Sequence, residues 1–389
     1  MCTVKHLAEE VRSGLRSVLP DLNKSPLSKL SLCVAAALEV QTCNTMDIAA
    51  VIPLETDRID MQYQWLSRFL STHTVDNDEV MMPFIRQAIQ AASGSGETLI
   101  LCIDQTPISD RFGILMVSLR FGGRALPLLW RVQKGTGNIG YDICKEILDK
   151  IIPVIPSESK VLLLGDRFYG QANLITYCQR HGWDYRLRLK GNLKVFTEDG
   201  TEASTKELVP STTGTKEVYL ENIFLTEQRV PTNISILQEP GHEEPWILAT
   251  GSNPNYYTTL DYGMRWGCEA MFSDFKTRGF GLEDTQLERT DRVARLLLIL
   301  SVALHWCVFT GISDRLENPL PREKKTEELG FDDFENKDEP RDTLPAVVKK
   351  TWRSACSFFK RGLRVLKKYA QKLKRLPPIF LVQIKSDGW

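Results

Sequence analysis

The sequence predicts an α/β fold, and the order of its apolar patterns is the main reason. Three runs of β type at residues 98–103, 113–121 and 125–132 are joined by short turns that contain glycine. They are followed by a helical pattern, a strand, a second helix and a second strand, at 141–152, 161–164, 171–181 and 185–189. A three-stranded meander followed by two helix–strand pairs is the element order of the ribonuclease H-like fold, which a final helix should close.

That final helix is delayed by a segment of different composition. Residues 191–250 are rich in Thr, Glu and Gly and contain β-type runs at 217–226, 233–237 and 246–249, so they predict a β insertion. Helical periodicity resumes near residue 256 and continues past Lys276. We therefore assign residues 97–190 and 251–312 to two parts of one catalytic core.

A helical N-terminal domain is predicted at residues 1–96, because residues 26–90 show the spacing of several short helices. Residues 44–70 resemble a helix-turn-helix, since Pro53 separates two short helices. The second helix is expected to present polar residues that could contact bases or phosphates, namely Arg58, Gln62, Gln64 and Arg68. The same residues could instead form the solvated face of a small helical bundle.

Charge is distributed unevenly, although the chain holds 49 Lys and Arg against 49 Asp and Glu. An acidic linker is predicted at residues 313–344 and a basic helical tail at 345–389. The tail contains twelve basic residues and one acid, Asp387. The nine isolated cysteines indicate a reducing cytoplasm. The apolar run at 296–312 is shorter than a usual membrane span and contains His305, so we expect a buried core helix and no membrane partner.

Two acids follow predicted strands of buried type. Asp104 ends the first strand and Asp166 ends the run at 161–165. In the expected order these strands are parallel neighbours, so both carboxylates converge at the edge of the sheet where α/β proteins bind ligands. Taken singly, each Asp could equally cap a loop or a helix.

A third acid lies within a spaced set of functional groups. Tyr262, Arg265, Glu269 and Lys276 fall within an arc of roughly 60° on a continuous helix. One helix face would then present a carboxylate beside two cations and a phenol, which suits a metal next to a phosphodiester. A solvated helix surface could carry the same residues.

The set Tyr262-x2-Arg265-x3-Glu269-x6-Lys276 resembles the Tyr-Arg-Glu-Lys signature of bacterial insertion-sequence transposases of the DDE type. Asp104 and its two following residues resemble the first acidic motif of that family. Asp166 with Arg167 resembles the second, and residues 123–130 resemble its typical strand sequence. Phe168 departs from the family, which often has Glu after Asp-Arg.

The resemblance implies a DNA transposase that acts by cut-and-paste. Two Mg²⁺ ions, or Mn²⁺ in their place, would be held by Asp104, Asp166 and Glu269. Water would cleave the transposon end, and the freed 3′-hydroxyl would attack target DNA. The residues expected to contact DNA are Tyr262, Arg265, Lys276, Arg167, Arg58 and Arg68.

Two further features bear on DNA handling and assembly. Trp246 begins a run that resembles the strand whose Trp stacks on a flipped base in related transposases, although Trp246 could equally be a core residue.

The tail contains apolar residues that alternate by four and three positions and so form a coiled-coil-like seam: Trp352, Cys356, Phe359, Leu363, Leu366, Ala370 and Leu373. We expect this seam to support the pairing of two molecules on two DNA ends, and the alternative is that it packs on its own catalytic domain.

Other functions fit parts of the pattern. A nuclease or a domesticated transposase relative would keep the same acids, and a non-catalytic DNA-binding regulator would use only the helical domain and the basic tail. A phosphatase of the haloacid dehalogenase type would need a second Asp two residues after Asp104, where Thr106 stands. The resemblance places the protein in the bacterial cytoplasm, associated with the nucleoid, with terminal inverted repeats and target DNA as its partners.

Overall fold

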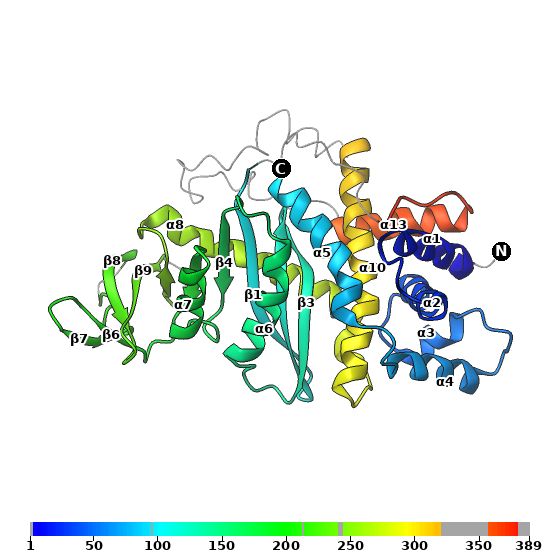
Figure 1. The fold of residues 1–389 in the computed structure, drawn as a ribbon, viewed down its shortest axis with the longest axis horizontal. Helices are drawn as coiled ribbons and strands as arrows, with labels where there is room; N and C mark the ends of the chain where they lie inside the picture. Colours follow the sequence, from blue (N-terminus) through cyan, green and yellow to red (C-terminus); the bar gives the residue numbers. More distant parts are fainter. Residues whose placement is uncertain (1–2, 95, 212–213, 240–243, 320–356, 380–389) are drawn as a thin grey trace. The chain divides into compact units, whose positions relative to one another are not determined.

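The computed structural model describes the whole chain except residues 1–2, 95, 212–213, 240–243, 320–356 and 380–389 (Figure 1). The chain forms two compact units. Of the described residues, unit 1 contains those within 3–76, 279–286, 295–319 and 357–379, and unit 2 contains those within 77–278 and 287–294. Most of the expected acidic linker lies outside the described residues, as do Trp352 and Cys356 of the expected seam.

Unit 2 is built on one sheet with strand order β3-β2-β1-β4-β5-β10-β9-β8-β6-β7. Its strands are β1 (Leu99–Ile108), β2 (Phe112–Phe121), β3 (Arg124–Lys134), β4 (Val161–Gly165), β5 (Asp184–Arg188), β6 (Lys194–Phe196), β7 (Glu202–Ser204), β8 (Lys216–Leu225), β9 (Val230–Gln238) and β10 (Trp246–Thr250). The predicted meander is confirmed, because β1 pairs antiparallel with β2 and β2 with β3. The predicted parallel neighbours are confirmed as well, because β1 runs parallel to β4, which runs parallel to β5.

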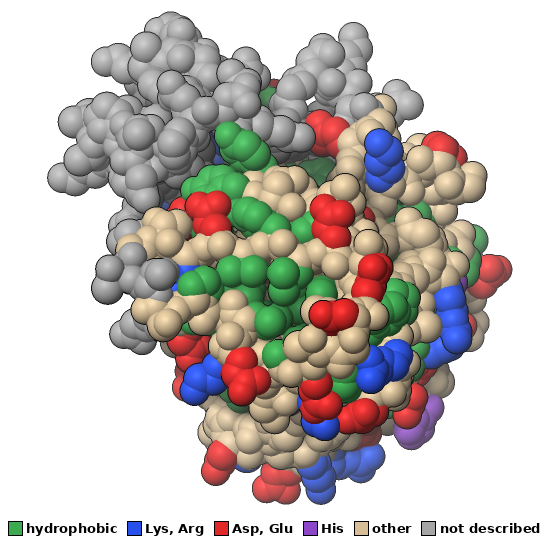
Figure 2. Space-filling view, turned by 90° about the vertical axis from the view of Figure 1, so that its left-hand side faces the viewer, with side chains coloured by type: hydrophobic (Ala, Val, Ile, Leu, Met, Phe, Trp, Pro, Cys, Tyr) green, Lys and Arg blue, Asp and Glu red, His purple; other side chains and the backbone are tan. Residues whose placement is uncertain are grey.

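The segment expected as a β insertion is formed of strands and continues the same sheet. β10 pairs antiparallel with β5, with Ala249 opposite Leu187, and β9 and β8 follow as an antiparallel hairpin. Figure 2 views this end of the sheet: hydrophobic side chains gather in the middle of the face, and acidic and basic side chains are interspersed around them. Because both signs of charge are mixed there, this face does not present a uniformly basic surface to DNA.

Helices cover both faces of the sheet in unit 2. α6 (Tyr141–Ile151) and α7 (Ala172–Arg180) lie side by side on one face (Figure 1). α9 (Gly267–Phe275) packs on the other face, where the Cys268 thiol lies 3.3 Å from the Ser118 hydroxyl. α5 (Asn77–Ser93) packs on β1, β2 and β3, so it belongs with the sheet rather than with the helices that precede it.

The expectation of one continuous helix from residue 256 past Lys276 is wrong. The segment consists of α8 (Tyr256–Leu260), a 3₁₀ turn (Asp261–Trp266) and α9, which ends at Phe275. Gly267 begins α9 where the chain crosses β3, and a Cβ at this position would lie only 3.1 Å from the backbone carbon of Arg124. The helical spacing was present in the sequence, but the tighter turn changes the direction of the side chains before Glu269.

Unit 1 is helical. It contains α1 (Thr3–Val18), α2 (Lys24–Val40), α3 (Thr45–Val51), α4 (Ile59–Leu70), most of α10 (Thr290–Glu317) and α13 (Phe358–Gln371). The predicted short helices at α2, α3 and α4 are confirmed, whereas α1 was not predicted. Helix α10 is long and apolar enough to cross a membrane, but 94% of its most apolar window is buried inside the protein, as expected of a core helix.

The tail helix α13 packs on its own chain. Gly362 meets Gly311 of α10 so closely that a Cβ on Gly362 would lie 2.8 Å from the Gly311 nitrogen. Buried on the same helix are Phe359, Leu363, Leu366 and Ala370. Because these described residues fill the core of unit 1, the expectation that the seam pairs two molecules is wrong for them. Leu373 is not part of the seam, since it lies beyond the helix with 51% of its surface exposed.

Candidate active site

Asp104 and Asp166 lie beside each other at the same edge of the sheet. Their preceding residues, Ile103 and Gly165, are paired across the parallel strands β1 and β4. The backbone N–H of Gln105 donates to Asp104 Oδ1 at 2.9 Å, and the N–H of Phe168 donates to Asp166 Oδ1 at 2.9 Å. Asp166 is therefore held in the turn that follows β4, as expected. Asp104 does not end its strand as expected: β1 continues to Ile108, and Asp104 lies just beyond the residues of β1 that pair with β4.

Arg265 links Glu269 to Asp104, because it forms an ion pair with each of them. Arg265 Nη1 lies 2.5 Å from Asp104 Oδ2, and its Nη2 lies 3.4 Å from Glu269 Oε1. Burial raises the pKa of Asp166, and the positive charge of Arg265 opposes this rise. One guanidinium is thus the shared counter-ion of three carboxyl groups from β1, the β4 turn and α9.

Burial is the main influence on the charge of these acids. It raises the pKa of Asp104 to about 6, and the negative charges of Asp166 and Glu269 add to that rise while Arg265 opposes it. Burial also raises the pKa of Asp166 and of Glu269. Close carboxyl groups with raised pKa values are typical of functional sites, because ionic structural pairs usually shift acids in the opposite direction.

The raised pKa of Asp104 predicts a pH dependence of stability. An unfolded Asp releases its proton near pH 3.9, whereas folded Asp104 keeps it to about pH 6. The folded state binds more protons between these values, so stability falls as the pH rises through this window. We expect Asp104→Asn to gain on the order of 2 kcal/mol relative to the wild type between about pH 4 and about pH 7. Urea unfolding in EDTA measures this difference, and a difference independent of pH would contradict it.

The site is suited to a hard metal ion by the chemistry of its donors. Carboxylate oxygens are the ligands that Mg²⁺ prefers. Burial disfavours the ionised form of Asp104, and a bound cation would stabilise that form. As placed, no three His, Cys, Asp or Glu side chains among the described residues stand close enough to hold a metal. Arg265 forms ion pairs with both Asp104 and Glu269, so a metal ion held by these two carboxylates would have to displace its guanidinium.

Two other members of the expected helix face do not lie on one helix with Glu269. Tyr262 is on the 3₁₀ turn and only 3% exposed, and burial raises the pKa of its phenol. Lys276 follows the last residue of α9 with a non-helical backbone. The expected common face of Tyr262, Arg265, Glu269 and Lys276 is therefore wrong, although Arg265 and Glu269 do meet.

Trp246 and Arg167 lie at the border of the insertion. Trp246 is half-buried, and its ring meets that of Tyr262 edge-on with centroids 5.1 Å apart. This contact gives Trp246 a packing role in the structure. Arg167 follows Asp166 and forms an ion pair with the exposed Glu244, so its guanidinium lies at the protein surface.

The predicted DNA-contacting residues of the N-terminal helices belong to unit 1, whereas the acids belong to unit 2. Arg58 precedes α4 and pairs with Asp60 at 2.6 Å on the surface, and Arg68 is exposed in the last turn of α4. Gln62 does not face solvent, because it is 9% exposed and donates to the carbonyl of Thr56. The expectation that Gln62 contacts bases is wrong.

The sequence interpretation missed two features of this site. Arg265 was expected to hold DNA phosphate, but it also neutralises the acids; its spacing of four residues from Glu269 was the available signal. Gln105 also has a positioning role. It accepts from the N–H of Ile139 and donates to the carbonyl of Gly137, which ties the loop before α6 to β1 beside Asp104.

Residues 141–306 match the family model described as Transposase DDE domain. This segment, which is less than half of the chain, is similar to the DDE domain of transposases. The match includes Asp166, Arg265 and Glu269, whereas Asp104 lies before it. A search of curated proteins found no match. DDE transposases of insertion sequences act on DNA and generally use divalent metal ions, which agrees with the carboxylate donors of this DDE domain.

Proposed function

We propose that the protein is a metal-dependent DNA transposase that cleaves transposon ends and joins them to target DNA by cut-and-paste. The observation that carries this proposal is the convergence of Asp104, Asp166 and Glu269 around Arg265 in a DDE domain. The strand order β3-β2-β1-β4-β5 and its parallel centre support a ribonuclease H-like core. The subgroup with the Tyr-x2-Arg-x3-Glu-x6-Lys signature is part of the proposal.

The three carboxylates are proposed to hold two Mg²⁺ ions, with Mn²⁺ as an alternative. When bound, such ions activate the attacking oxygen and stabilise the leaving oxygen of the phosphodiester. The residues of the chain prepare this chemistry: the N–H groups of Gln105 and Phe168 orient Asp104 and Asp166. Arg265 keeps the acids neutralised before the ions arrive, and its guanidinium can then bind the DNA phosphate.

The partners of this function are duplex DNA at the terminal inverted repeats and at the target. We propose that two copies of the protein act on paired ends, in the cytoplasm and at the nucleoid. The N-terminal helices, with Arg58 and Arg68, are proposed to contribute to end binding. Arg167 and Lys276 are proposed to contact phosphates nearer the acids.

The proposal is tested with a supercoiled plasmid that carries the gene and its flanking DNA. Purified protein with Mg²⁺ is expected to release a fragment with defined ends and to insert it into a second plasmid, and EDTA should abolish both products. Cleavage at many unrelated positions without insertion would identify a nuclease instead. End binding without any cleavage in Mg²⁺ or Mn²⁺ would favour a regulator and overturn the proposal.

A further inference from the structure

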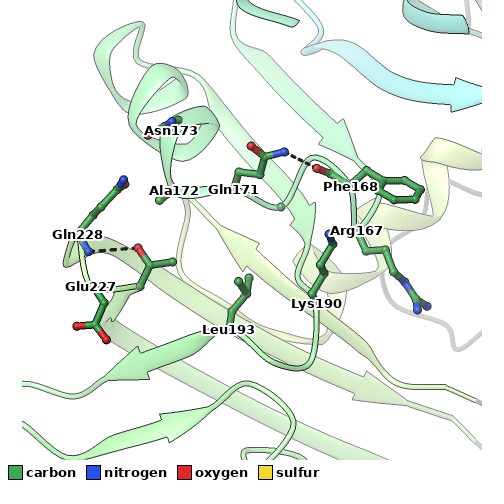
Figure 3. A pocket seen from close by; sticks show the side chains of 11 residues that line it. Arg167, Phe168, Gln171, Ala172, Asn173, Lys190, Leu193, Glu227 and Gln228 are labelled. Atoms are coloured by element: carbon green, nitrogen blue, oxygen red, sulfur yellow. Dashed lines mark hydrogen bonds between the residues drawn. The ribbon is translucent and has the colours of Figure 1, made fainter. Parts of the chain in front are cut away.

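Two adjoining hollows lie next to Asp166 in unit 2. The smaller has a volume of about 430 Å³ and the larger about 750 Å³, and both are lined by Arg167, Phe168 and Lys190. Figure 3 shows the smaller one, with Lys190 pointing towards Phe168. The hollows lie between the turn after β4 and the strands of the insertion, and neither Asp104 nor Glu269 lines them.

Phe168 is an exposed aromatic ring on a fixed backbone. It is 41% exposed although it stands only two residues after Asp166. Its N–H donates to Asp166 Oδ1, and its carbonyl accepts from Gln171 Nε2 at 2.5 Å. The ammonium of Lys190 lies 5.5 Å from the ring centroid. The ring is therefore held in place beside a catalytic acid while part of its surface remains open to solvent.

The larger hollow is strongly cationic. Its described lining contains one acid, Glu244, against five basic residues: Arg167, Arg188, Lys190, Lys206 and Lys216. Arg167 and Arg188 share Glu244, which is 60% exposed, and such surface pairs contribute little and exchange readily. Within the described part of the chain, the three lysines form no ion pair. Several positive charges are thus available to an anionic ligand.

We propose that Phe168 and these cations bind an unpaired nucleotide of DNA, with its base stacked on the Phe168 ring and its phosphates on the surrounding cations. The base must be unpaired, because a duplex keeps both faces of each internal base stacked. Phe168 suits this role better than Trp246, whose ring is half-buried against Tyr262. This proposal rests on the proposed function for the identity of the strand, which is the DNA next to the scissile phosphate.

Stacking is measured with full-length protein in EDTA, so that no cleavage occurs. The probe is a single-stranded DNA of about ten nucleotides that contains 2-aminopurine, whose fluorescence falls when the base stacks. We expect the wild type to bind and quench the probe. Phe168→Ala should bind roughly 5-fold to 100-fold more weakly and lose the quenching, whereas Phe168→Trp should keep both. Tyr257→Ala, at an aromatic residue 49% exposed on α8, is the matched control and should change neither.

The cations are tested with the same probe. Lys190→Gln and Lys206→Gln should weaken binding and flatten its dependence on salt, because fewer counterions are released, whereas Lys145→Gln on α6 should not. Unchanged quenching in Phe168→Ala would overturn the proposal, even if the lysine variants bind weakly. Tighter binding of RNA than of DNA would overturn the choice of ligand. A failure of metal-dependent transposition would leave these binding results intact, so the two proposals fail separately.

Discussion

Asp104→Asn is expected to reduce Mg²⁺-dependent strand cleavage by roughly 1,000-fold or more, because the amide cannot supply the charged oxygen that a metal ion needs. Asp166→Asn and Glu269→Gln should have effects of the same order. Each substitution preserves the shape of the side chain, so binding to end DNA should change little. Single-turnover cleavage of a labelled transposon end, with a gel-shift assay of the same DNA, measures both quantities.

The matched control is Asp142→Asn, which neutralises an exposed acid in the first turn of α6, outside the described site. This variant should cleave at close to the wild-type rate. Near wild-type cleavage by any of the three site variants would show that the corresponding acid is not a metal ligand. Loss of DNA binding in parallel with cleavage would instead identify a folding defect.

Asp274→Ala is expected to cost about 3–5 kcal/mol of unfolding free energy, because it leaves a buried guanidinium without its partner. Asp274 on α9 pairs with Arg124 on β3, and their side chains are only 5% and 8% exposed. Burial lowers the pKa of Arg124 to about 10 even with this partner present. Urea unfolding followed by circular dichroism measures the loss.

Two variants separate the buried charge from the general effect of losing an ion pair. Glu202→Ala breaks an exposed ion pair with Lys194, in which the Glu202 and Lys194 side chains are 50% and 52% exposed. This variant should lose less than about 1 kcal/mol of unfolding free energy. The double substitution Arg124→Met with Asp274→Leu removes both charges and should recover most of the stability. An Asp274→Ala variant as stable as Glu202→Ala would contradict the expectation.

The strands and the two aspartates could be predicted because their signals are local. Buried strands appear as continuous apolar runs, and Asp104 and Asp166 follow such runs directly. The strands that precede the two aspartates were expected to pair in parallel because a helix connects the meander to the second of these strands. The turn that positions Arg265 was not predictable from spacing, since a 3₁₀ segment and an α-helix share similar apolar patterns. The depth of Tyr262 was missed for the same reason.

The helices of unit 1 show the opposite limitation. Helix α1 carries a clear apolar stripe at Val4, Leu7, Val11 and Leu15, so its omission was an error of interpretation. The partner of α13 could not be obtained this way, because periodicity identifies a buried face but not what covers it. Gln62 is buried because its side chain donates to the carbonyl of Thr56 in the preceding loop, and a polar residue in the sequence does not reveal such a contact.

Unit 1 brings α1 and α2 together with α13, which is far from them in the sequence, and this arrangement affects how the protein folds during synthesis. His6 lies 2.8 Å from the carbonyl of Lys374, and Lys367 donates to the carbonyl of Glu39. On the ribosome, α1 and α2 leave the exit tunnel well before α13 is synthesised. Because protein synthesis adds about 5–20 residues per second, the apolar surface of the nascent α1 and α2 stays uncovered for on the order of half a minute. Residues Asn77–Arg278 of unit 2 are contiguous in the sequence, so they can fold during this interval. A transcript truncated before α13 would therefore yield a folded sheet attached to an incomplete helical unit. Chaperones and proteases would recognise the uncovered apolar surface of that unit.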